Sequence, residues 1–212
     1  MNFCNLNKRL LMRKVILASG NKGKLKELQE ILSDLPFELI PQPKTDEYEV
    51  EETGTTFIEN AIIKARHAAQ LSGMPAIADD SGLVINALNG EPGIKTARYA
   101  GQGCSPQDNM DLILQRLKPF DDKKQRKATF VCALVYMRSA IDPLPVIAVG
   151  QWHGAITREK HGDAGFGYDP VFWDFKHKMT AAQMPKSLKT QLSHRGKACR
   201  KLKKKLKKIW GK

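Results

Sequence analysis

The sequence lacks the marks of several protein classes. Its four cysteines form no C-x-x-C pair, which argues against a zinc site or a disulfide framework and fits a reduced cytoplasm. No apolar run is long enough to cross a membrane, and the block Leu10–Met12 is too short for a signal-peptide core. The G-x-x-x-x-G-K-[ST] loop is also missing, which disfavours a kinase or a P-loop NTPase. We therefore expect a cytoplasmic protein that makes no membrane contact.

Acidic residues are absent from segment 197–212, which holds nine Lys and Arg residues. Without these nine residues, the net charge falls from +13 to +4. Ala198, Leu202, Leu206 and Ile209 recur at helical spacing, so we expect a helix docked through this apolar stripe, with its lysines in water. A nucleic-acid-binding or membrane-surface arm is the alternative. It is not favoured, because it leaves the acidic clusters upstream unexplained.

Extended and helical patterns alternate along the 212 residues, which predicts an α/β fold with a mixed sheet. The predicted strands cover residues 15–18, 37–40, 76–78, 83–85, 128–137 and 146–152. The predicted helices begin after the turn at 19–24, at a capping box on Thr56 that opens a helix ending at Ser72, and after caps at Ser105 and Ser193. We expect one domain over 14–212, preceded by an N-terminal extension, 1–13, for which Met12 is an alternative start.

The first predicted strand ends in a turn of small and basic residues, Ser19–Lys24. A helix start presents unpaired N–H groups and a positive dipole end, so it can bind an anion. Gly20 and Gly23 allow close approach of the backbone, and Lys22 and Lys24 supply compact positive charges for phosphate oxygens. The alternative is an ordinary strand–helix turn.

Two pairs of neighbouring carboxylates, Glu51-Glu52 and Asp79-Asp80, lie outside obvious helix faces. Hard oxygen ligands of this kind suit Mg²⁺, which takes one or two carboxylates together with substrate phosphates. The alternatives are a turn at Asp79-Asp80, since Ser81 and Gly82 follow, and a solvated loop at Glu51-Glu52. We favour the metal site because a simple turn does not require two adjacent carboxylates.

A glycine-rich segment, Gly162–Pro170, surrounds two aromatic residues, Phe166 and Tyr168. Such a loop can lay a ring against a nucleobase, and Asp169 can then accept hydrogen bonds from base N–H groups. The alternative, a hairpin with both rings in the core, is equally compatible with the sequence.

Hydrogen-bond donors also cluster at the start of the last predicted helix, at Lys189, His194 and Arg195. His194 and Arg195 can donate to a carbonyl oxygen of a base. Simple helix capping is the alternative.

Taken in order, these segments resemble the inosine triphosphate pyrophosphatases, also called XTP/dITP diphosphatases. The resemblance runs from about Lys14 to Leu202. The matching motifs are Ser19-x-Asn21-x-x-Lys24, Glu51-Glu52-Thr53-Gly54-x-Thr56-Phe57-x-Glu59-Asn60-Ala61, Ala78-Asp79-Asp80-Ser81-Gly82-Leu83, Pro92-Gly93-Ile94, Ala97-Arg98-Tyr99, Gly165-Phe166-Gly167-Tyr168-Asp169-Pro170 and Ser193-His194-Arg195-Gly196. It departs only at the extra N-terminal residues and at the lysine-rich end.

The resemblance implies hydrolysis of non-standard purine nucleoside triphosphates (ITP, dITP, XTP) to the monophosphate and pyrophosphate. It implies an elongated mixed sheet, two lobes that clasp the nucleotide, and a homodimer. Asp80 would be proton acceptor and metal ligand, and Glu51 or Glu52, with Asp79, would complete the Mg²⁺ shell. The implied substrate-binding residues are Ser19, Gly20, Asn21, Lys22, Gly23, Lys24, Lys64, Ser81, Phe166, Gly167, Tyr168, Asp169, Lys189, His194 and Arg195. Among these, Lys64 would reach the phosphates and Phe166 would stack on the purine.

Overall fold

The structure is a computed structural model that describes residues 13–210. The expected N-terminal extension up to Met12, including the alternative start, lies outside the described residues. The strands are β1 (Arg13–Ala18), β2 (Phe37–Pro41), β3 (Ala76–Ile85), β4 (Pro92–Gly93), β5 (Lys127–Met137), β6 (Val146–Ile156), β7 (Phe172–Asp174) and β8 (Met179–Thr180). The α-helices of the described range are α2 (Lys22–Leu32), α3 (Phe57–Ser72), α4 (Pro106–Arg116), α5 (Lys186–Leu192) and α6 (His194–Trp210).

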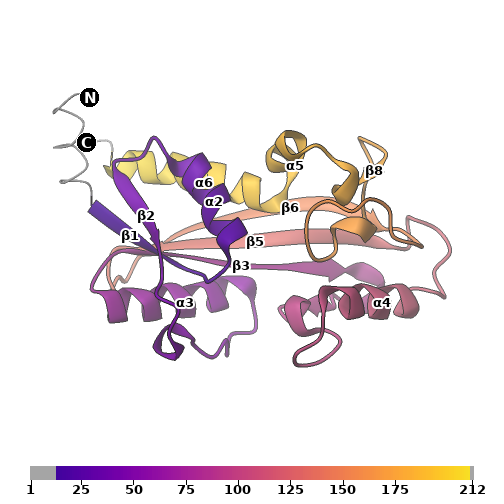
Figure 1. Cartoon of the computed structure of the whole chain (residues 1–212), viewed down its shortest axis with the longest axis horizontal. Helices are drawn as coiled ribbons and strands as arrows, with labels where there is room; N and C mark the ends of the chain where they lie inside the picture. Colours follow the sequence, from indigo (N-terminus) through magenta and orange to yellow (C-terminus); the bar gives the residue numbers. More distant parts are fainter. Residues whose placement is uncertain (1–12, 211–212) are drawn as a thin grey trace. The chain divides into compact units, whose positions relative to one another are not determined.

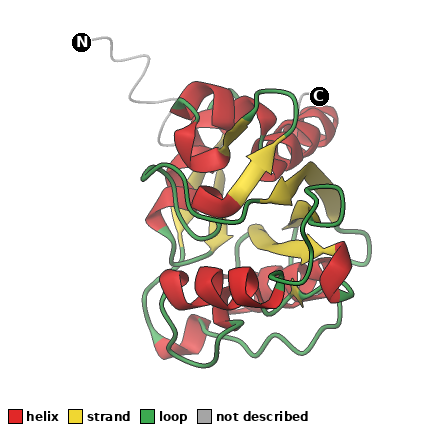
Figure 2. Ribbon diagram, turned by 90° about the vertical axis from the view of Figure 1, so that its right-hand side faces the viewer, coloured by secondary structure: helices red, strands yellow, loops and turns green. Residues whose placement is uncertain are grey.

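The strands form one mixed sheet in the order β2-β1-β3-β5-β6-β7-β8, with β4 paired to β3. Helices flank the strands (Figure 2), so the predicted α/β class with a mixed sheet is confirmed. None of the helices in residues 13–210 has the length and apolar character of a membrane span.

The chain divides into two compact units, which we call unit 1 and unit 2. Unit 1 contains the residues up to Asp80, Ala133–Ala148 and the segment from Ala198 onward. Unit 2 contains Ser81–Cys132 and Val149–Lys197. The single domain over 14–212 and the nucleotide cleft stay predictions.

Unit 1 is built on parallel strands. β1 pairs with β2 from Arg13↔Phe37 onward and with β3 from Ile16↔Ala76 onward. Helix α3 packs against β1, and α2 lies on the opposite face of these strands (Figure 1). The buried β1 residues Val15–Ala18 carry the chain straight to the turn at Ser19.

Unit 2 pairs its strands antiparallel, as in β3 with β4, β6 with β7 and β7 with β8. Its core includes Leu83, Ile113 and Phe172, which are fully buried. The guanidinium of Arg126 is buried as well, and it donates only to backbone carbonyls: those of Thr157 at 2.6 Å, Leu117 at 2.7 Å, Ile156 at 2.8 Å and Phe120 at 3.2 Å. This one side chain therefore satisfies the carbonyl groups of two separate chain segments.

The predicted helix starts at Thr56, Ser105 and Ser193 and the predicted end at Ser72 are confirmed, because each depends on a local signal. The start of the first helix was placed too late: α2 begins at Lys22, inside the turn predicted over 19–24, with Asn21 as its cap. Thr56 and Glu59 form a capping box at the start of α3, and Gly73 ends that helix in the left-handed conformation with φ of 65°. Ser105 and Asp108 form the capping box of α4. The Ser193 hydroxyl accepts from the backbone N–H of Gly196 at 3.0 Å in the first turn of α6.

Two strand predictions were wrong in extent. The strands predicted separately at 76–78 and 83–85 are one strand, since β3 continues without a break from Ala76 to Ile85, and the alternative of a turn at Asp79-Asp80 is excluded. The two aspartates are tolerated inside a strand because lysines neutralise them, as described below. β6 extends to Ile156 rather than Trp152, and α5 and the short strands β4, β7 and β8 were not predicted from the sequence.

Candidate active site

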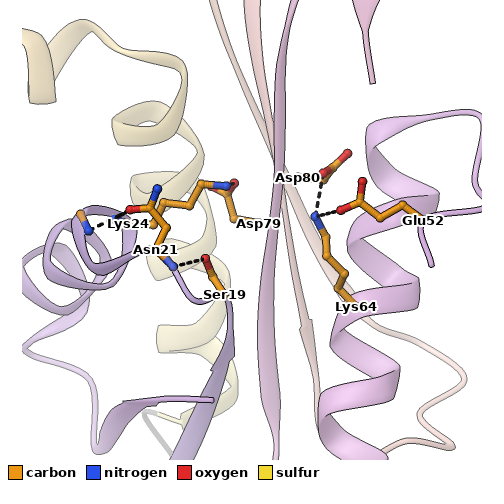
Figure 3. A network of polar contacts seen from close by, with 8 residues as sticks. Ser19, Asn21, Lys24, Glu52, Lys64, Asp79 and Asp80 are labelled. Carbon is orange, nitrogen blue, oxygen red and sulfur yellow. Dashed lines mark hydrogen bonds and ion pairs between the residues drawn. The ribbon is translucent and has the colours of Figure 1, made fainter. Parts of the chain in front are cut away.

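The two adjacent carboxylates of β3, Asp79 and Asp80, point to opposite faces of the strand (Figure 3). Successive side chains of a strand alternate in this way. Asp79 points toward α2 and Asp80 toward α3, so each meets a lysine from a different helix. The two aspartates therefore do not share one ligand position, contrary to the simplest form of the predicted metal site.

On the α2 side, the Nζ of Lys24 lies 2.5 Å from Oδ1 of Asp79. The Asp79 side chain is fully buried. Lys24 lies in the first turn of α2, which fixes the direction of its side chain. In this turn the side-chain oxygen of Asn21 accepts from the N–H groups of Gly23 at 2.9 Å and Lys24 at 3.1 Å. The hydroxyl of Ser19 accepts from the N–H of Asn21 at 3.2 Å. Asn21 thus caps this helix, and phosphate binding by the turn stays a prediction.

On the α3 side, the Nζ of Lys64 bridges two carboxylates. It lies 2.7 Å from Oδ1 of Asp80 and 2.8 Å from Oε1 of Glu52. Lys64 comes from the middle of α3, and Glu52 from the loop that precedes this helix (Figure 3). Glu51, in contrast, has an exposed side chain, which favours Glu52 as the carboxylate that acts with Asp80.

The loop with Glu51 and Glu52 is fixed to the first turn of α3. The buried side chain of Asn60 accepts from the backbone N–H of Gly54 at 2.9 Å. A Cβ on Gly54 would lie 2.6 Å from Cβ of Glu59 and 2.7 Å from Oδ1 of Asn60, so only glycine fits. Both residues belong to a motif identified from the sequence, but no role was predicted for them. Sequence reasoning missed the hydrogen bond between these two residues, which lie six positions apart in the same motif.

Burial dominates the electrostatics of the α3 side. It raises the pKa of Asp80, and the nearby carboxylates of Glu52 and Asp79 add to this effect, while Lys64 opposes it. Burial alone would lower the pKa of Lys64, but Asp80 and Glu52 outweigh it and raise that pKa. Lys64 therefore stays protonated, and a further positive charge nearby would stabilise the ionised form of Asp80.

The residues fit a divalent cation on two observations. Oδ2 of Asp80 is buried and has no hydrogen-bond partner among the described residues, and a buried oxygen of this kind is costly unless a ligand satisfies it. The carboxylate of Glu52 also contacts the same Lys64 ammonium group as Asp80, so two hard oxygen donors of the kind that Mg²⁺ prefers lie on the α3 side of β3. Within residues 13–210, no three His, Cys, Asp or Glu side chains form a metal cage by themselves.

A second cluster lies in unit 2, around the exposed ring of Phe166. This ring is 57% exposed, and two cations face it. The Nζ of Lys189 lies 4.9 Å and the Cζ of Arg195 5.5 Å from its centroid. A flat aromatic surface beside two hydrogen-bond donors is suited to a planar, polar ring such as a purine.

The loop that presents this ring is held by Asp169. Its buried carboxylate accepts from the N–H of Phe166 at 2.7 Å and forms an ion pair with Lys189. Gly165 has a φ of 89°, and a Cβ at this position would overlap that carboxylate. Loop and helix α5 are thereby tied together at the exposed ring.

The remaining predicted residues of unit 2 are more enclosed. Tyr168 is 4% exposed, and its hydroxyl donates to the Thr96 carbonyl at 2.7 Å. Of the two rings, Tyr168 thus follows the core alternative and Phe166 does not. The ring of His194 stacks on Phe130, with centroids 4.7 Å apart, and Arg195 is also buried.

Three glycines and two polar residues complete the predicted set. The space beside Gly20 is open, since no heavy atom lies within 4 Å of the place that a Cβ would take, and Gly167 adopts a φ of 60°. Ser81 follows Asp80 in β3 and Gly23 lies in the first turn of α2. The side chain of Lys22 lies outside what the structure describes.

Comparison with known proteins adds independent information. Residues 15–205 match the model of the Ham1 family. The dITP/XTP pyrophosphatase of Vibrio cholerae serotype O1 is 51% identical over 191 residues, which are 90% of this chain and 95% of that protein. The dITP/XTP pyrophosphatase of Escherichia coli O157:H7 is 50% identical over 187 residues, 88% of this chain and 94% of that protein.

Solved structures agree with the sequence comparison. A HAM1 protein from Coxiella burnetii has a TM-score of 0.88 at 46% identity, covering 93% of this chain and 100% of the other. A nucleoside-triphosphatase, or dITP/XTP pyrophosphatase, from Mycobacterium abscessus has a TM-score of 0.74 at 38% identity, covering 89% of this chain and 98% of the other.

Proposed function

The chain belongs to the Ham1 family, and on this premise we propose that it hydrolyses ITP, dITP and XTP to the nucleoside monophosphate and pyrophosphate. The observation that carries the proposal is about 50% identity, over nearly the whole chain, to proteins named dITP/XTP pyrophosphatase. Removal of non-standard purine nucleotides from the nucleotide pool is the corresponding cellular role.

Unit 1 supplies the groups that would bind the triphosphate. Lys24 and Lys64 bring two ammonium groups to the two faces of one strand. Phosphate-group transfer needs little covalent help from a protein, so charge neutralisation and positioning carry most of the rate. Ser19 and Asn21, in the turn before α2, would add hydrogen bonds to the phosphate oxygens.

Asp80 is our candidate for the general base. A carboxylate at this position can orient a water molecule and accept its proton as the water attacks phosphorus. Asp80 and Glu52 would hold Mg²⁺, which usually binds through one or two carboxylates together with substrate phosphates. When bound, Mg²⁺ supplies charge for the phosphate oxygens and acidifies water. Asp79 serves instead to fix Lys24.

Unit 2 supplies the groups that would recognise the base. Phe166 offers a stacking surface, and Lys189, His194 and Arg195 are donors for a carbonyl oxygen at C6 of hypoxanthine or xanthine. Adenine carries an amino group there, which would leave these donors unpaired. An unpaired buried donor costs enough to lower the rate by orders of magnitude. A preference for ITP over ATP follows, whereas these donors do not account for a rejection of guanine.

The proposal is tested by incubating the purified protein with Mg²⁺ and ITP, dITP, XTP or ATP in turn. We expect monophosphate and pyrophosphate from the first three substrates, much slower turnover of ATP, and no turnover after EDTA treatment. Release of orthophosphate as the main product would contradict the proposed cleavage. A homodimer, also implied by the resemblance, is checked by light scattering of the same preparation.

A further inference from the structure

Helix α6 is docked on unit 1 by one face only. Ala198, Cys199, Leu202 and Leu206 are fully buried on that face. At its end, the ring of Trp210 packs against Phe37, with centroids 5.7 Å apart. The docked helix predicted from the sequence is therefore confirmed, except that Ile209, the last residue of the predicted stripe, is 41% exposed. The docking fixes which side chains the opposite face presents.

The two edges of the docked helix are tied down by lysines. On one edge, Lys203 and Lys207 each lie 2.8 Å from a carboxylate oxygen of Asp34. On the other edge, Lys205 donates to the carbonyl of Ile147 at 2.6 Å. Each edge is thus attached to the body of unit 1, and α6 cannot roll about its own axis without breaking these contacts.

The outward face carries a straight row of basic residues, Lys201, Lys204 and Lys208, which we call the outer row. Their spacing of three and four residues places them on one face of a helix, opposite the buried stripe. Lys201, Lys204 and Lys208 are exposed, as is Arg200 beside them. The row spans about 10 Å at a rise of about 1.5 Å per residue. Lys204 and Lys208 form no ion pair with any residue of the range 13–210.

We propose that the outer row is a docking surface for the phosphate backbone of nucleic acid. Duplex DNA carries one negative charge per about 1.7 Å of helix axis, so a row of about 10 Å meets several phosphates. α6 contains no acidic residue that would repel them. Binding of this kind needs only charge and is independent of base sequence.

An anionic membrane is the less suitable partner for the same helix. A helix that lies in a membrane surface buries an apolar face in the lipid. Most of the apolar face of α6 is already buried in the protein, since Leu202 and Leu206 are 0% exposed, and only Ile209 of the predicted stripe is exposed, at 41%. The outer row offers charge alone, which matches a polyanion in solution.

The test measures binding of the full-length protein to a fluorescein-labelled 20-bp DNA duplex by anisotropy, at several NaCl concentrations. The variant is Lys201→Gln, Lys204→Gln and Lys208→Gln combined, because glutamine keeps the helix propensity and removes the charge. The matched control replaces three exposed lysines of unit 2, Lys118, Lys124 and Lys127, by glutamine. Both variants lose the same net charge.

Each neutralised phosphate contributes about 0.9 to the slope of log K against log salt concentration. We expect the outer-row variant to lower this slope by about 2, since Lys204 and Lys208 are the residues of the row without an ion pair in the described range, and the control to change it by less than about 1. Both variants should retain ITP hydrolysis, so the result is separate from the proposed enzymatic function. Equal weakening in both variants, or no duplex binding by the wild type in 50 mM NaCl, would overturn the proposal. Binding to phosphatidylserine vesicles but not to DNA would also overturn it.

Discussion

Substitution of Gly54 by alanine tests whether the acidic loop is clamped to α3. The added Cβ would lie 2.6 Å from Cβ of Glu59 and 2.7 Å from Oδ1 of Asn60. Neither atom can move away easily, because Cβ of Glu59 is fixed to the helix backbone and the side chain of Asn60 is fully buried. The loop must therefore move away, and Glu52 moves with it.

The magnitude follows from two losses. Overpacking of a fitted contact costs about 1–3 kcal/mol, and the hydrogen bond from Gly54 to Asn60 contributes about 1 kcal/mol. If the loop detaches from α3, the unfavourable contact is relieved, but Glu52 is displaced from Lys64 and Asp80 and binds Mg²⁺ less well. We expect either a free energy of unfolding lower by about 1–3 kcal/mol or a higher Mg²⁺ requirement for ITP turnover.

Thermal unfolding and the Mg²⁺ dependence of turnover are measured together for the same variant. Gly20→Ala is the stability control, because no heavy atom lies within 4 Å of the Cβ position at Gly20. We expect no loss of stability in this control. A Gly54→Ala protein with wild-type stability and wild-type Mg²⁺ dependence would refute the clamp.

Four further variants test other parts of the structure. Asp80→Asn should lower kcat by about a hundredfold or more with the fold intact, as expected for loss of a general base; near-normal turnover would remove Asp80 from that role. Phe166→Ala should raise KM for ITP by removing the stacking surface, and an unchanged KM would show that the ring does not touch the base. Arg126→Met should lower the free energy of unfolding by about 3 kcal/mol, because four carbonyls lose their buried donor. Urea unfolding measures this loss, and an unchanged free energy would contradict the role given to Arg126. Hydrogen bonds from Arg138 hold the pKa of Asp142 well below its usual range, so this pair stabilises the fold above about pH 4 and less as the pH falls. The stability difference between wild type and Asp142→Asn should therefore shrink on acidification, and a constant difference would contradict the assignment.

Local signals in the sequence predicted the starts of three helices and most of the strands. A cap acts within one turn of its own residue, so the helix starts at Thr56 and Ser105 could be predicted without knowledge of the rest of the fold. The extent of β3 could not be read in this way. Asp, Ser and Gly favour turns, and the lysines that neutralise Asp79 and Asp80 are 55 and 16 residues away in the sequence.

Local sequence signals also could not show that Phe166 is exposed while Tyr168 is buried. Phe166 and Tyr168 are separated by one glycine, and both adjoining glycines have positive φ values, 89° at Gly165 and 60° at Gly167. A loop with this backbone follows no simple alternation of side chains. The outcome depends on a distant partner, the Thr96 carbonyl, which accepts from the Tyr168 hydroxyl at 2.7 Å.

A competition between ITP and ATP is the decisive test of the proposed hydrolysis of non-standard purine nucleoside triphosphates. The protein is given equal concentrations of both nucleotides with Mg²⁺ in ¹⁸O-labelled water, and the products are identified by mass spectrometry. We expect ¹⁸O-labelled IMP and unlabelled pyrophosphate, with far less AMP, and neither product from Asp80→Asn on the same time scale. Equal amounts of IMP and AMP, or orthophosphate as the labelled product, would contradict it.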